Sequence, residues 1–301
     1  MSGLSDNCGF LLFGAGYWLK RFVLRRRIPF IGGYVLNESC NLSCDHCRVS
    51  NRGDAKDPTF DEALGGLDAL YGRGARLLAI TGGEPFHWRD GEKTLEDVIL
   101  AARRKGFRRI SVYTNGTFPL VSSADTIFVS LDGRRESTRK LRGDVYDQVF
   151  RNIDESSHGN IIVNFTINAL NRGDVEPFCR EVAENRKIKG VFFFFHTPYY
   201  GRDELFVDKE MKKSIVEILI RMKRIKLPVL NSMACLKAVA SDKWNRPTDF
   251  CQVYAEGKIV DCCRSNGNRD ACDNCGYLGY VEVERIMKLH PSAIAAGFNY
   301  I

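Results

Sequence analysis

The chain has 301 residues, of which 44% are hydrophobic and 27% are charged, with 44 Lys and Arg against 37 Asp and Glu. This composition is typical of a folded globular protein and excludes a disordered chain, a collagen-like chain and a small disulfide scaffold. The net charge of +7 is concentrated near the start, where the first 30 residues carry five basic side chains and one acidic one. Nucleic-acid surfaces usually carry a broader basic stripe, so we do not expect a nucleic-acid partner.

The first predicted element is a basic amphipathic segment over residues 1–28. Its apolar stretch at 10–19 has about half of the ~20 residues that cross a bilayer. Aromatic side chains and the arginines at 25–27 suit either a helix lying on an anionic membrane surface or a helix packed across the body of the protein. The start lacks the basic n-region of a secretory signal peptide. We expect a cytoplasmic protein, peripheral on the inner membrane face in the first alternative.

Residues 29–227 alternate short apolar runs with amphipathic stretches. The apolar runs are rich in Val, Ile and Phe and predict six strands, at 31–37, 77–81, 110–114, 126–130, 161–167 and 191–195. The amphipathic stretches predict helices at 57–71, 94–105, 146–156, 174–185 and 208–223. Repeated βα units make parallel sheets, so we expect an α/β fold, either a partial TIM-like barrel or an open sheet. In both, the site lies in the loops that follow the strands.

The 11 cysteines fall into groups, and an odd total in tight groups indicates metal ligation in a reducing compartment rather than disulfides. The first group, Cys40, Cys44 and Cys47, lies in one loop after a buried strand. Three thiolates at this spacing suit three irons of a 4Fe-4S cluster and leave the fourth iron without a protein ligand. Zinc is the alternative, but it needs a fourth ligand that His46, beside Cys47, is poorly placed to supply.

Three further loops extend the pattern: Thr81-Gly82-Gly83-Glu84-Pro85, Thr114-Asn115-Gly116 and Ser130-Leu131-Asp132-Gly133. Together with the cysteine triplet, and in this order over roughly residues 31–200, they resemble the radical S-adenosylmethionine (SAM) superfamily. The resemblance implies a partial (β/α)6 barrel whose 4Fe-4S cluster binds the amino and carboxylate groups of SAM at the open iron. It also implies reductive cleavage of SAM to methionine and a 5′-deoxyadenosyl radical, with an electron donor such as a flavodoxin or ferredoxin.

The resemblance also implies which residues bind SAM. The Gly82 to Pro85 segment would receive the methionyl ammonium, because glycines leave the backbone open and Glu84 is an acceptor. Short polar groups after the next strands could hold ribose hydroxyls or the methionyl carboxylate, although Asn-Gly and Asp-Gly also form turns. An imidazole replaces the aromatic residue usual before the last cysteine and can still cover an adenine edge. The SAM-binding candidates are therefore His46, Gly82, Gly83, Glu84, Pro85, Asn115, Ser130 and Asp132.

Residues 228–301 are irregular and cysteine-rich, which predicts a separate small module with Glu256-Gly257 as a hairpin turn. Adjacent residues of an extended chain point opposite ways, so one of Cys262 and Cys263 should be a ligand, and we select Cys262. The spacing resembles SPASM and twitch auxiliary modules and implies a second 4Fe-4S cluster, with zinc as the alternative. The expected ligands are Cys251, Cys262, Cys272 and Cys275, whereas Cys8, Cys179 and Cys235 are expected to be buried small side chains.

The substrate is not identified by the sequence. The basic, aromatic start favours a membrane-associated lipid or isoprenoid-like substrate. The auxiliary-cluster spacing favours a peptide-modifying maturase, although the 30 residues before the first strand leave no room for a peptide-binding domain. A third hypothesis, a non-enzymatic metal-stapled binding protein on a degenerate barrel, predicts bound zinc and no cleavage of SAM.

Overall fold

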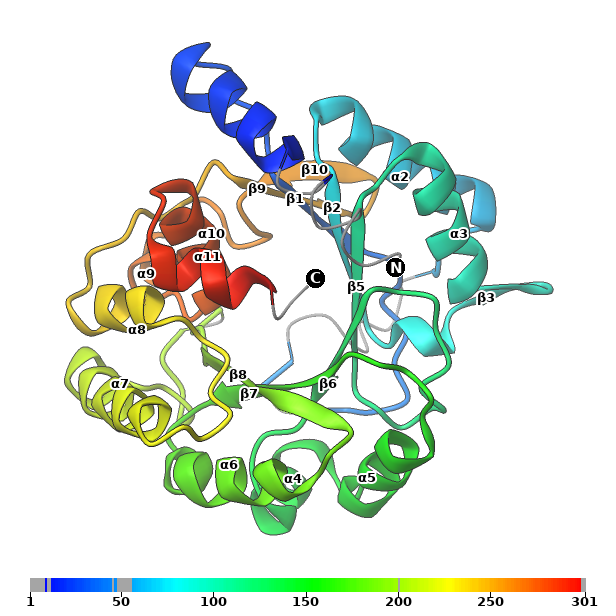
Figure 1. Ribbon diagram of the computed structural model, residues 1–301. Helices are drawn as coiled ribbons and strands as arrows, with labels where there is room; N and C mark the ends of the chain where they lie inside the picture. The colour runs from blue at the N-terminus through cyan, green and yellow to red at the C-terminus, as the bar shows by residue number, and fades with distance from the viewer. Residues whose placement is uncertain (1–8, 10–11, 45, 48–55, 200, 299–301) are drawn as a thin grey trace.

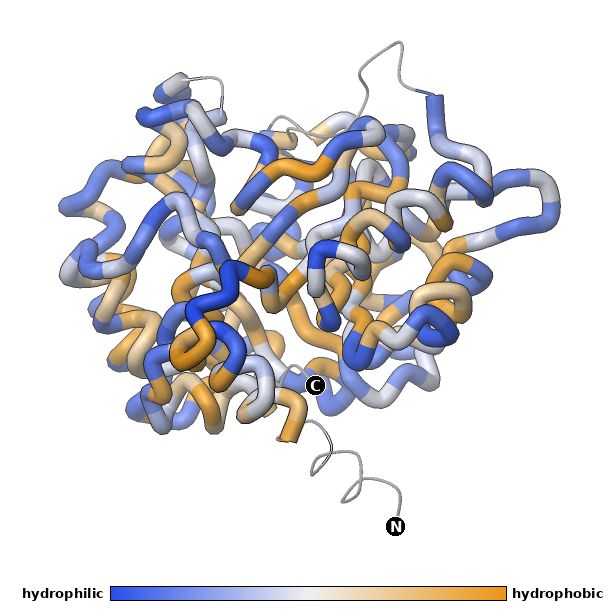
Figure 2. Tube along the Cα trace, turned by 90° about the horizontal axis from the view of Figure 1, so that it is seen from above, coloured by the Kyte–Doolittle hydropathy of each residue, from blue (hydrophilic) through white to orange (hydrophobic). Residues whose placement is uncertain are grey.

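The computed structural model of the chain describes residues 9, 12–44, 46–47, 56–199 and 201–298. Its central feature is a curved sheet with the strand order β10-β9-β1-β2-β5-β6-β7-β8 (Figure 1). Hydrophobic segments run along the interior and hydrophilic ones along the periphery (Figure 2). The six strands that alternate with helices pair in parallel; they are β1 (Ile31–Val35), β2 (Leu77–Thr81), β5 (Arg109–Thr114), β6 (Thr126–Ser130), β7 (Ile161–Ile167) and β8 (Ile188–Phe195).

Helices cover the outside of this sheet (Figure 1). Their ends carry standard signals: Thr59 and Glu62 form a capping box at the start of the first, and Gly74 ends it with φ of 109°. A short hairpin, β3 (Arg89–Asp90) and β4 (Lys93–Thr94), and the 3-10 turns η2 (Pro85–His87) and η3 (Arg172–Asp174) lie between them. The helices are α2 (Phe60–Arg73), α3 (Leu95–Lys105), α4 (Arg135–Arg142), α5 (Tyr146–Glu155), α6 (Val175–Glu184) and α7 (Lys209–Arg224).

The predicted α/β partial barrel is confirmed, and all six predicted strands are present. The boundaries differ by a few residues, since β1 ends at Val35 instead of residue 37 and β8 begins at Ile188 instead of residue 191. Helix α4 was not predicted. It is rich in Arg and Lys and buries only Thr138 and Leu141, so its sequence lacks a clear apolar periodicity.

The C-terminal segment is more regular than predicted and takes part in the barrel. Strand β9 (Cys251–Ala255) pairs in parallel with β1, and β10 (Lys258–Asp261) returns antiparallel to β9. The expected hairpin turn is present, with positive φ at Glu256 and Gly257. Cys251 and Ile31 are partners in the β9–β1 register. The module boundary at residue 228 stays a prediction; the helices of this segment are α8 (Met233–Ala240), α9 (Arg269–Asp273), α10 (Leu278–Met287) and α11 (Pro291–Gly297).

Helix α10 closes the gap between the two edges of the sheet (Figure 1). Just before it, the Gly276 carbonyl accepts a hydrogen bond from the Phe195 amide of β8 at 3.0 Å. On its other side, the Tyr280 hydroxyl donates to the Cys262 carbonyl, just after β10, at 2.9 Å. The strands and α10 therefore enclose a central lumen.

The N-terminal segment packs on the barrel. Residues 12–18 are helical and continue as the π-helical turn η1 (Leu19–Val23). The Tyr17 hydroxyl donates to the Ile28 carbonyl at 2.7 Å, and Trp18 Nε1 donates to the Met287 carbonyl at 3.2 Å. Within the described residues, no helix is both long and apolar enough to cross a membrane. The packed alternative is therefore present, and the possibility of a membrane contact rests on the outward side of the helix.

Candidate active site

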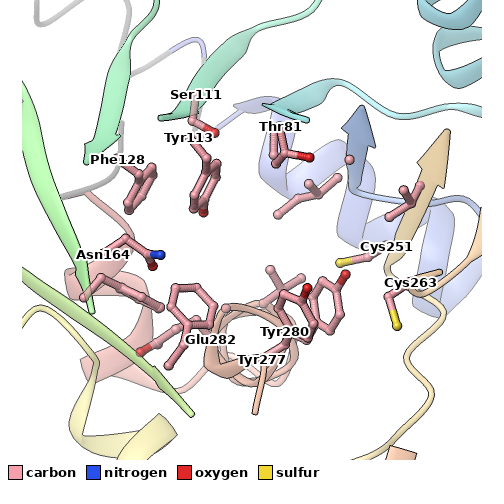
Figure 3. A pocket seen from close by; sticks show the side chains of 18 of the residues that line it. Thr81, Ser111, Tyr113, Phe128, Asn164, Cys251, Cys263, Tyr277, Tyr280 and Glu282 are labelled. Carbon is pink, nitrogen blue, oxygen red and sulfur yellow. The ribbon is translucent and has the colours of Figure 1, made fainter. Parts of the chain in front are cut away.

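The lumen of the barrel is a cavity of about 890 Å³. Side chains of β2, β5, β6, β7 and α10 point into it, including Thr81, Tyr113, Phe128, Asn164 and Tyr280 (Figure 3). The three cysteines of the loop after β1 line its carboxyl-terminal end. The predicted SAM-binding residues divide into two sets: His46, Gly82, Gly83, Asn115 and Ser130 line the cavity, whereas Glu84, Pro85 and Asp132 lie behind this lining.

The thiols of Cys40, Cys44 and Cys47 interact electrostatically with one another. Cys40 Sγ accepts hydrogen bonds from the Leu42 amide at 3.4 Å and from Asn115 Nδ2 at 3.6 Å. Burial raises the pKa of Cys44 to about 11, against the positive charge of Arg142. Among the described residues, no three His, Cys, Asp or Glu side chains converge as ligands of one metal ion. Cluster thiolates bind separate irons and need not converge, so three thiols facing one cavity fit an iron–sulfur cluster.

Gly82 and Gly83 are glycines because the loop after β2 packs on the cysteine loop. A Cβ at Gly82 would lie 2.3 Å from Asn37 Oδ1, and one at Gly83 would lie 2.0 Å from the Ser39 carbonyl oxygen. The Gly83 amide donates to the Asn37 carbonyl at 2.7 Å, which ties the two loops together. These contacts explain both glycines without reference to a ligand, while their backbone still lines the cavity.

Glu84 is fully buried and links the loop after β2 to the loop after β5. Its carboxylate accepts hydrogen bonds from Thr114 Oγ1 at 2.7 Å, from the Asn115 amide at 2.6 Å and from the Phe86 amide at 3.0 Å. Burial raises the pKa of Glu84 in spite of these bonds. Pro85 begins the turn η2 and is buried. The geometry of Glu84 is that of a positioning group behind the cavity wall.

Asn115 and Ser130 end neighbouring strands at the cavity. Asn115 Nδ2 donates to Asn41 Oδ1 at 2.9 Å, and its Oδ1 accepts from Thr117 Oγ1 at 2.7 Å. Asn115 thus links the cysteine loop to the loop after β5. Ser130 is half-buried and lines the cavity.

Asp132 joins His46 of the cysteine loop to Arg142 of α4. Its Oδ2 lies 2.6 Å from Arg142 Nε and 3.2 Å from His46 Nε2, and its Oδ1 accepts from the Thr166 amide at 3.0 Å. Burial alone would raise the pKa of Asp132, but Arg142 and His46 hold it well below its usual range. Arg142 lines the cavity and was not predicted, because nothing local distinguishes it from the other basic residues of its helix.

The C-terminal cysteines gather at one wall of the lumen. Cys251 and Cys263 line the cavity (Figure 3). Electrostatic interactions join Cys263 to Cys251, Cys272 and Cys275. Cys262 has a positive φ of 66°, and its Sγ accepts from the Thr248 amide at 3.4 Å. Cys263 therefore interacts with Cys251, Cys272 and Cys275, whereas Cys262 interacts with Cys251 and Cys263, and the choice of Cys262 as the ligand stays a prediction.

The remaining cysteines were predicted to be buried small side chains. Cys179 and Cys235 are fully buried. Cys8 lies outside the described residues.

Comparison with known proteins shows which families this region of the chain resembles. Residues 34–178 match the radical SAM superfamily. Molybdenum cofactor biosynthesis protein 1 of Dictyostelium discoideum is 27% identical over 216 residues, which are 64% of this chain and 32% of that protein. The 7-carboxy-7-deazaguanine synthase of Rhodospirillum rubrum is 29% identical over 109 residues, 35% of this chain and 44% of that protein. The chain thus spans less than half the length of these curated relatives.

Solved structures share the fold. SuiB of Streptococcus suis bound to S-adenosylmethionine superposes with a TM-score of 0.63 at 15% identity, over 81% of this chain and 62% of that chain. Native anSMEcpe with bound AdoMet and Kp18Cys peptide superposes with a TM-score of 0.58 at 16% identity, over 79% of this chain and 75% of that chain. At such identities the likeness concerns the fold alone.

The fold is a partial TIM barrel with a cysteine loop at the carboxyl-terminal edge of its strands. Its residues 34–178 are similar to the radical SAM superfamily, whose model they match. The similarity to this superfamily implies SAM and a 4Fe-4S cluster, and it argues against the non-enzymatic hypothesis.

Proposed function

We propose that this enzyme binds a 4Fe-4S cluster at Cys40, Cys44 and Cys47 and reductively cleaves SAM there. When bound, the cluster supplies the electron that converts SAM to methionine and a 5′-deoxyadenosyl radical, which acts on a substrate in the lumen. The observation that carries the proposal is the position of the three thiols at one end of the barrel cavity, within the region that matches the superfamily. A small electron-transfer protein such as a flavodoxin or ferredoxin would deliver the electron.

The residues around the thiols would orient SAM. The backbone of Gly82 and Gly83, the hydroxyl of Ser130 and the ring of His46 line the cavity beside the cysteine loop. Arg142 adds a buried positive charge, partly balanced by Asp132, that favours anionic groups nearby. Glu84 would act by fixing the Asn115 loop.

We also propose an auxiliary 4Fe-4S cluster at Cys251, Cys263, Cys272 and Cys275, with zinc as the alternative metal. Cys251 and Cys263 line the cavity, and Cys263 also interacts with Cys272 and Cys275. Arg264, which follows Cys263, contacts Glu38 at 2.7 Å, just before the first cysteine loop. The two cysteine groups are thereby held in a fixed relation.

Metal and product analysis tests the assignment of the first cluster. The Cys40→Ala, Cys44→Ala, Cys47→Ala triple variant should lose about four irons and all 5′-deoxyadenosine formation after anaerobic reconstitution and reduction. The control Cys179→Ala removes a buried thiol of α6 that belongs to neither cysteine group. It should retain its iron and its 5′-deoxyadenosine formation. Full iron content and unchanged 5′-deoxyadenosine in the triple variant would contradict the proposal.

The substrate class that we propose is a membrane-associated lipid or isoprenoid, acted on by an enzyme peripheral on the inner membrane face. The lumen is walled by aromatic side chains, including Tyr113, Phe128, Phe192 and Phe194. Such walls suit an apolar ligand, since burial of apolar surface is favourable. The outward side of the N-terminal helix exposes apolar side chains beside a basic run.

A peptide substrate is the second candidate. It is favoured by the structural likeness to anSMEcpe, whose structure contains a bound peptide, and by the grouping of the C-terminal cysteines. Incubation with lipid extract or with peptide libraries, followed by mass spectrometry for products that depend on SAM, would separate the two classes.

Flotation with anionic vesicles tests the membrane contact. Exposed basic side chains near a bilayer contribute about 1 kcal/mol each. Replacement of Lys20, Arg25, Arg26 and Arg27 by Gln should therefore abolish flotation. Flotation of the wild type should weaken as the salt concentration rises. A control removes the same charge from exposed positions elsewhere, Arg104, Lys213, Arg224 and Lys226. Equal loss in both variants would mean that net charge alone drives binding.

A further inference from the structure

The lumen has a second mouth at the opposite end of the barrel from the cysteine loop. Ile31 and Leu77, the first residues of β1 and β2, line the same cavity as Cys40 and Gly82, which follow the ends of these strands. The cavity therefore runs the whole length of the strands, about 17–20 Å for strands of this size. Trp18 of the N-terminal helix and Phe298 after α11 also line it, at the amino-terminal edge.

The rim of this amino-terminal mouth is apolar and exposed. Leu289 and Phe298, which both line the cavity, are 56% and 40% exposed. On the N-terminal helix, Ala15 lines the cavity and is exposed, and Leu12 and Leu19, at helical spacing from it, are 70% and 51% exposed. Thus exposed apolar side chains of the N-terminal helix lie at helical spacing from Ala15, which lines the lumen.

The charge beside the mouth is mostly positive, with the exposed carboxylate of Asp249 paired to Arg21. Lys20, Arg25, Arg26 and Arg27 are all exposed and follow the exposed apolar side chains of the N-terminal helix in the chain. An apolar surface bordered by cations is complementary to an anionic bilayer, in which cations meet head groups and apolar side chains meet acyl chains. A soluble apolar molecule would not require this charge.

We propose that an apolar chain of a lipid in an anionic membrane enters the barrel through the amino-terminal mouth and reaches the cysteine loop from below. This deepens the proposed function and rests on it for the chemistry at the far end of the lumen. The N-terminal helix lies on the membrane with Leu12 and Leu19 inserted, and Gly14 and Ala15 border the passage. Lumen residues such as Phe128 and Phe194 then contact the chain along its length.

Two glycines of one helix provide a matched test. Gly14 lines the cavity and Gly16 is not among its lining residues, and a Cβ at either would meet no atom within 4 Å. Gly14→Phe should therefore obstruct the mouth, and Gly16→Phe should not, with equal changes in backbone propensity. The probe is cis-parinaric acid, a fluorescent fatty acid, presented in vesicles that contain phosphatidylglycerol.

We expect the wild type and Gly16→Phe to bind the probe with energy transfer from Trp18, and Gly14→Phe to bind roughly tenfold more weakly. Circular dichroism and thermal melting establish that both variants are folded. Equal affinity of the two variants, or no binding by the wild type, would overturn the proposal. Binding that appears only when residues 299–301 are deleted would also overturn it, because the chain's own end would then be the occupant. Probe binding is measured before the protein is reconstituted with iron. A failure of probe binding is therefore distinguishable from a failure of SAM cleavage, which is measured by 5′-deoxyadenosine formation.

Discussion

Cys262 and Cys263 are neighbours with different surroundings. Cys262 is buried, and its thiol accepts a hydrogen bond from the Thr248 amide. Cys263 lies on the cavity wall and interacts with Cys251, Cys272 and Cys275. The alternation of an extended chain predicts that one of the pair is a ligand, but it cannot indicate which one, because the choice depends on contacts remote in sequence.

Single alanine variants distinguish these two cysteines. In a protein that already lacks the first cluster, Cys263→Ala should lose about four irons, because it removes a thiolate of the proposed auxiliary site. Cys262→Ala should keep its iron and show only a modest loss of stability. Iron analysis after reconstitution is the measurement, and retention of iron in Cys263→Ala together with loss in Cys262→Ala would reverse the assignment.

Glu282 is a buried carboxyl group whose ionisation lowers the free energy of unfolding. It is 3% exposed, and its Oε1 accepts from the Ser232 amide at 2.6 Å. Burial raises the pKa of Glu282 from 4.5 to about 7. As pH rises, the unfolded chain loses this proton at a lower pH than the folded chain does. The free energy of unfolding therefore falls between pH 4.5 and about pH 7 and stays level above that range.

Glu282→Gln should remove this dependence, since the amide oxygen still accepts from Ser232 and carries no charge. Between pH 5 and pH 8 the free energy of unfolding of the variant should rise by about 2–3 kcal/mol relative to that of the wild type. Urea unfolding at the two pH values measures the difference. Parallel changes in wild type and variant would mean that Glu282 is not the group responsible.

At the scale of elements, helix α4 connects the cysteine loop to the barrel. Its last residue, Arg142, pairs with Asp132, and the two side chains are 10% and 0% exposed. Its first residue, Arg135, pairs with Asp147 on the surface, where both side chains are more than half exposed. One helix therefore carries a buried ion pair and an exposed one.

Removal of one carboxylate from each pair should have very different effects. Asp132→Asn leaves Arg142 buried without its counter-charge, which costs about 3–5 kcal/mol. Asp147→Asn breaks an exposed pair worth about 0–1 kcal/mol. Urea unfolding of both variants provides the comparison, and similar losses would show that the buried pair does not anchor α4.

At the scale of the whole molecule, the sequence predicted what is encoded locally. The cysteine loop and the Gly82 to Pro85 segment each follow an apolar run, so their place at the carboxyl-terminal edge of the strands followed from the βα pattern. The pairing of β9 with β1 joins residues more than 200 positions apart, as for Ile31 and Cys251. The closure of the gap by α10 is likewise a tertiary contact, and no local periodicity encodes either one.

The same distinction holds for the site. The candidate ligand cysteines and the candidate SAM-binding residues of the loops could be named from spacing and resemblance. Arg142 could not be named from the sequence, because it lies in a basic helix without a motif. The amino-terminal mouth could not be predicted either, because Trp18 and Phe298, which line it, come from opposite ends of the chain. The assignment of Glu84 to SAM binding stays a prediction, and the two hydrogen bonds that Glu84 accepts from Thr114 and Asn115, at the end of β5, emerge only when the strands are assembled.

The central claim is that the loop of Cys40, Cys44 and Cys47 carries a cluster that binds SAM. Electron paramagnetic resonance of the reduced protein tests it most directly, in a Cys272→Ala, Cys275→Ala background that removes the auxiliary site. The account predicts the signal of a single reduced 4Fe-4S cluster whose shape changes when SAM is added, and no such signal when Cys40, Cys44 and Cys47 are also replaced. A signal that SAM leaves unchanged, or one that survives loss of these three cysteines, would contradict it.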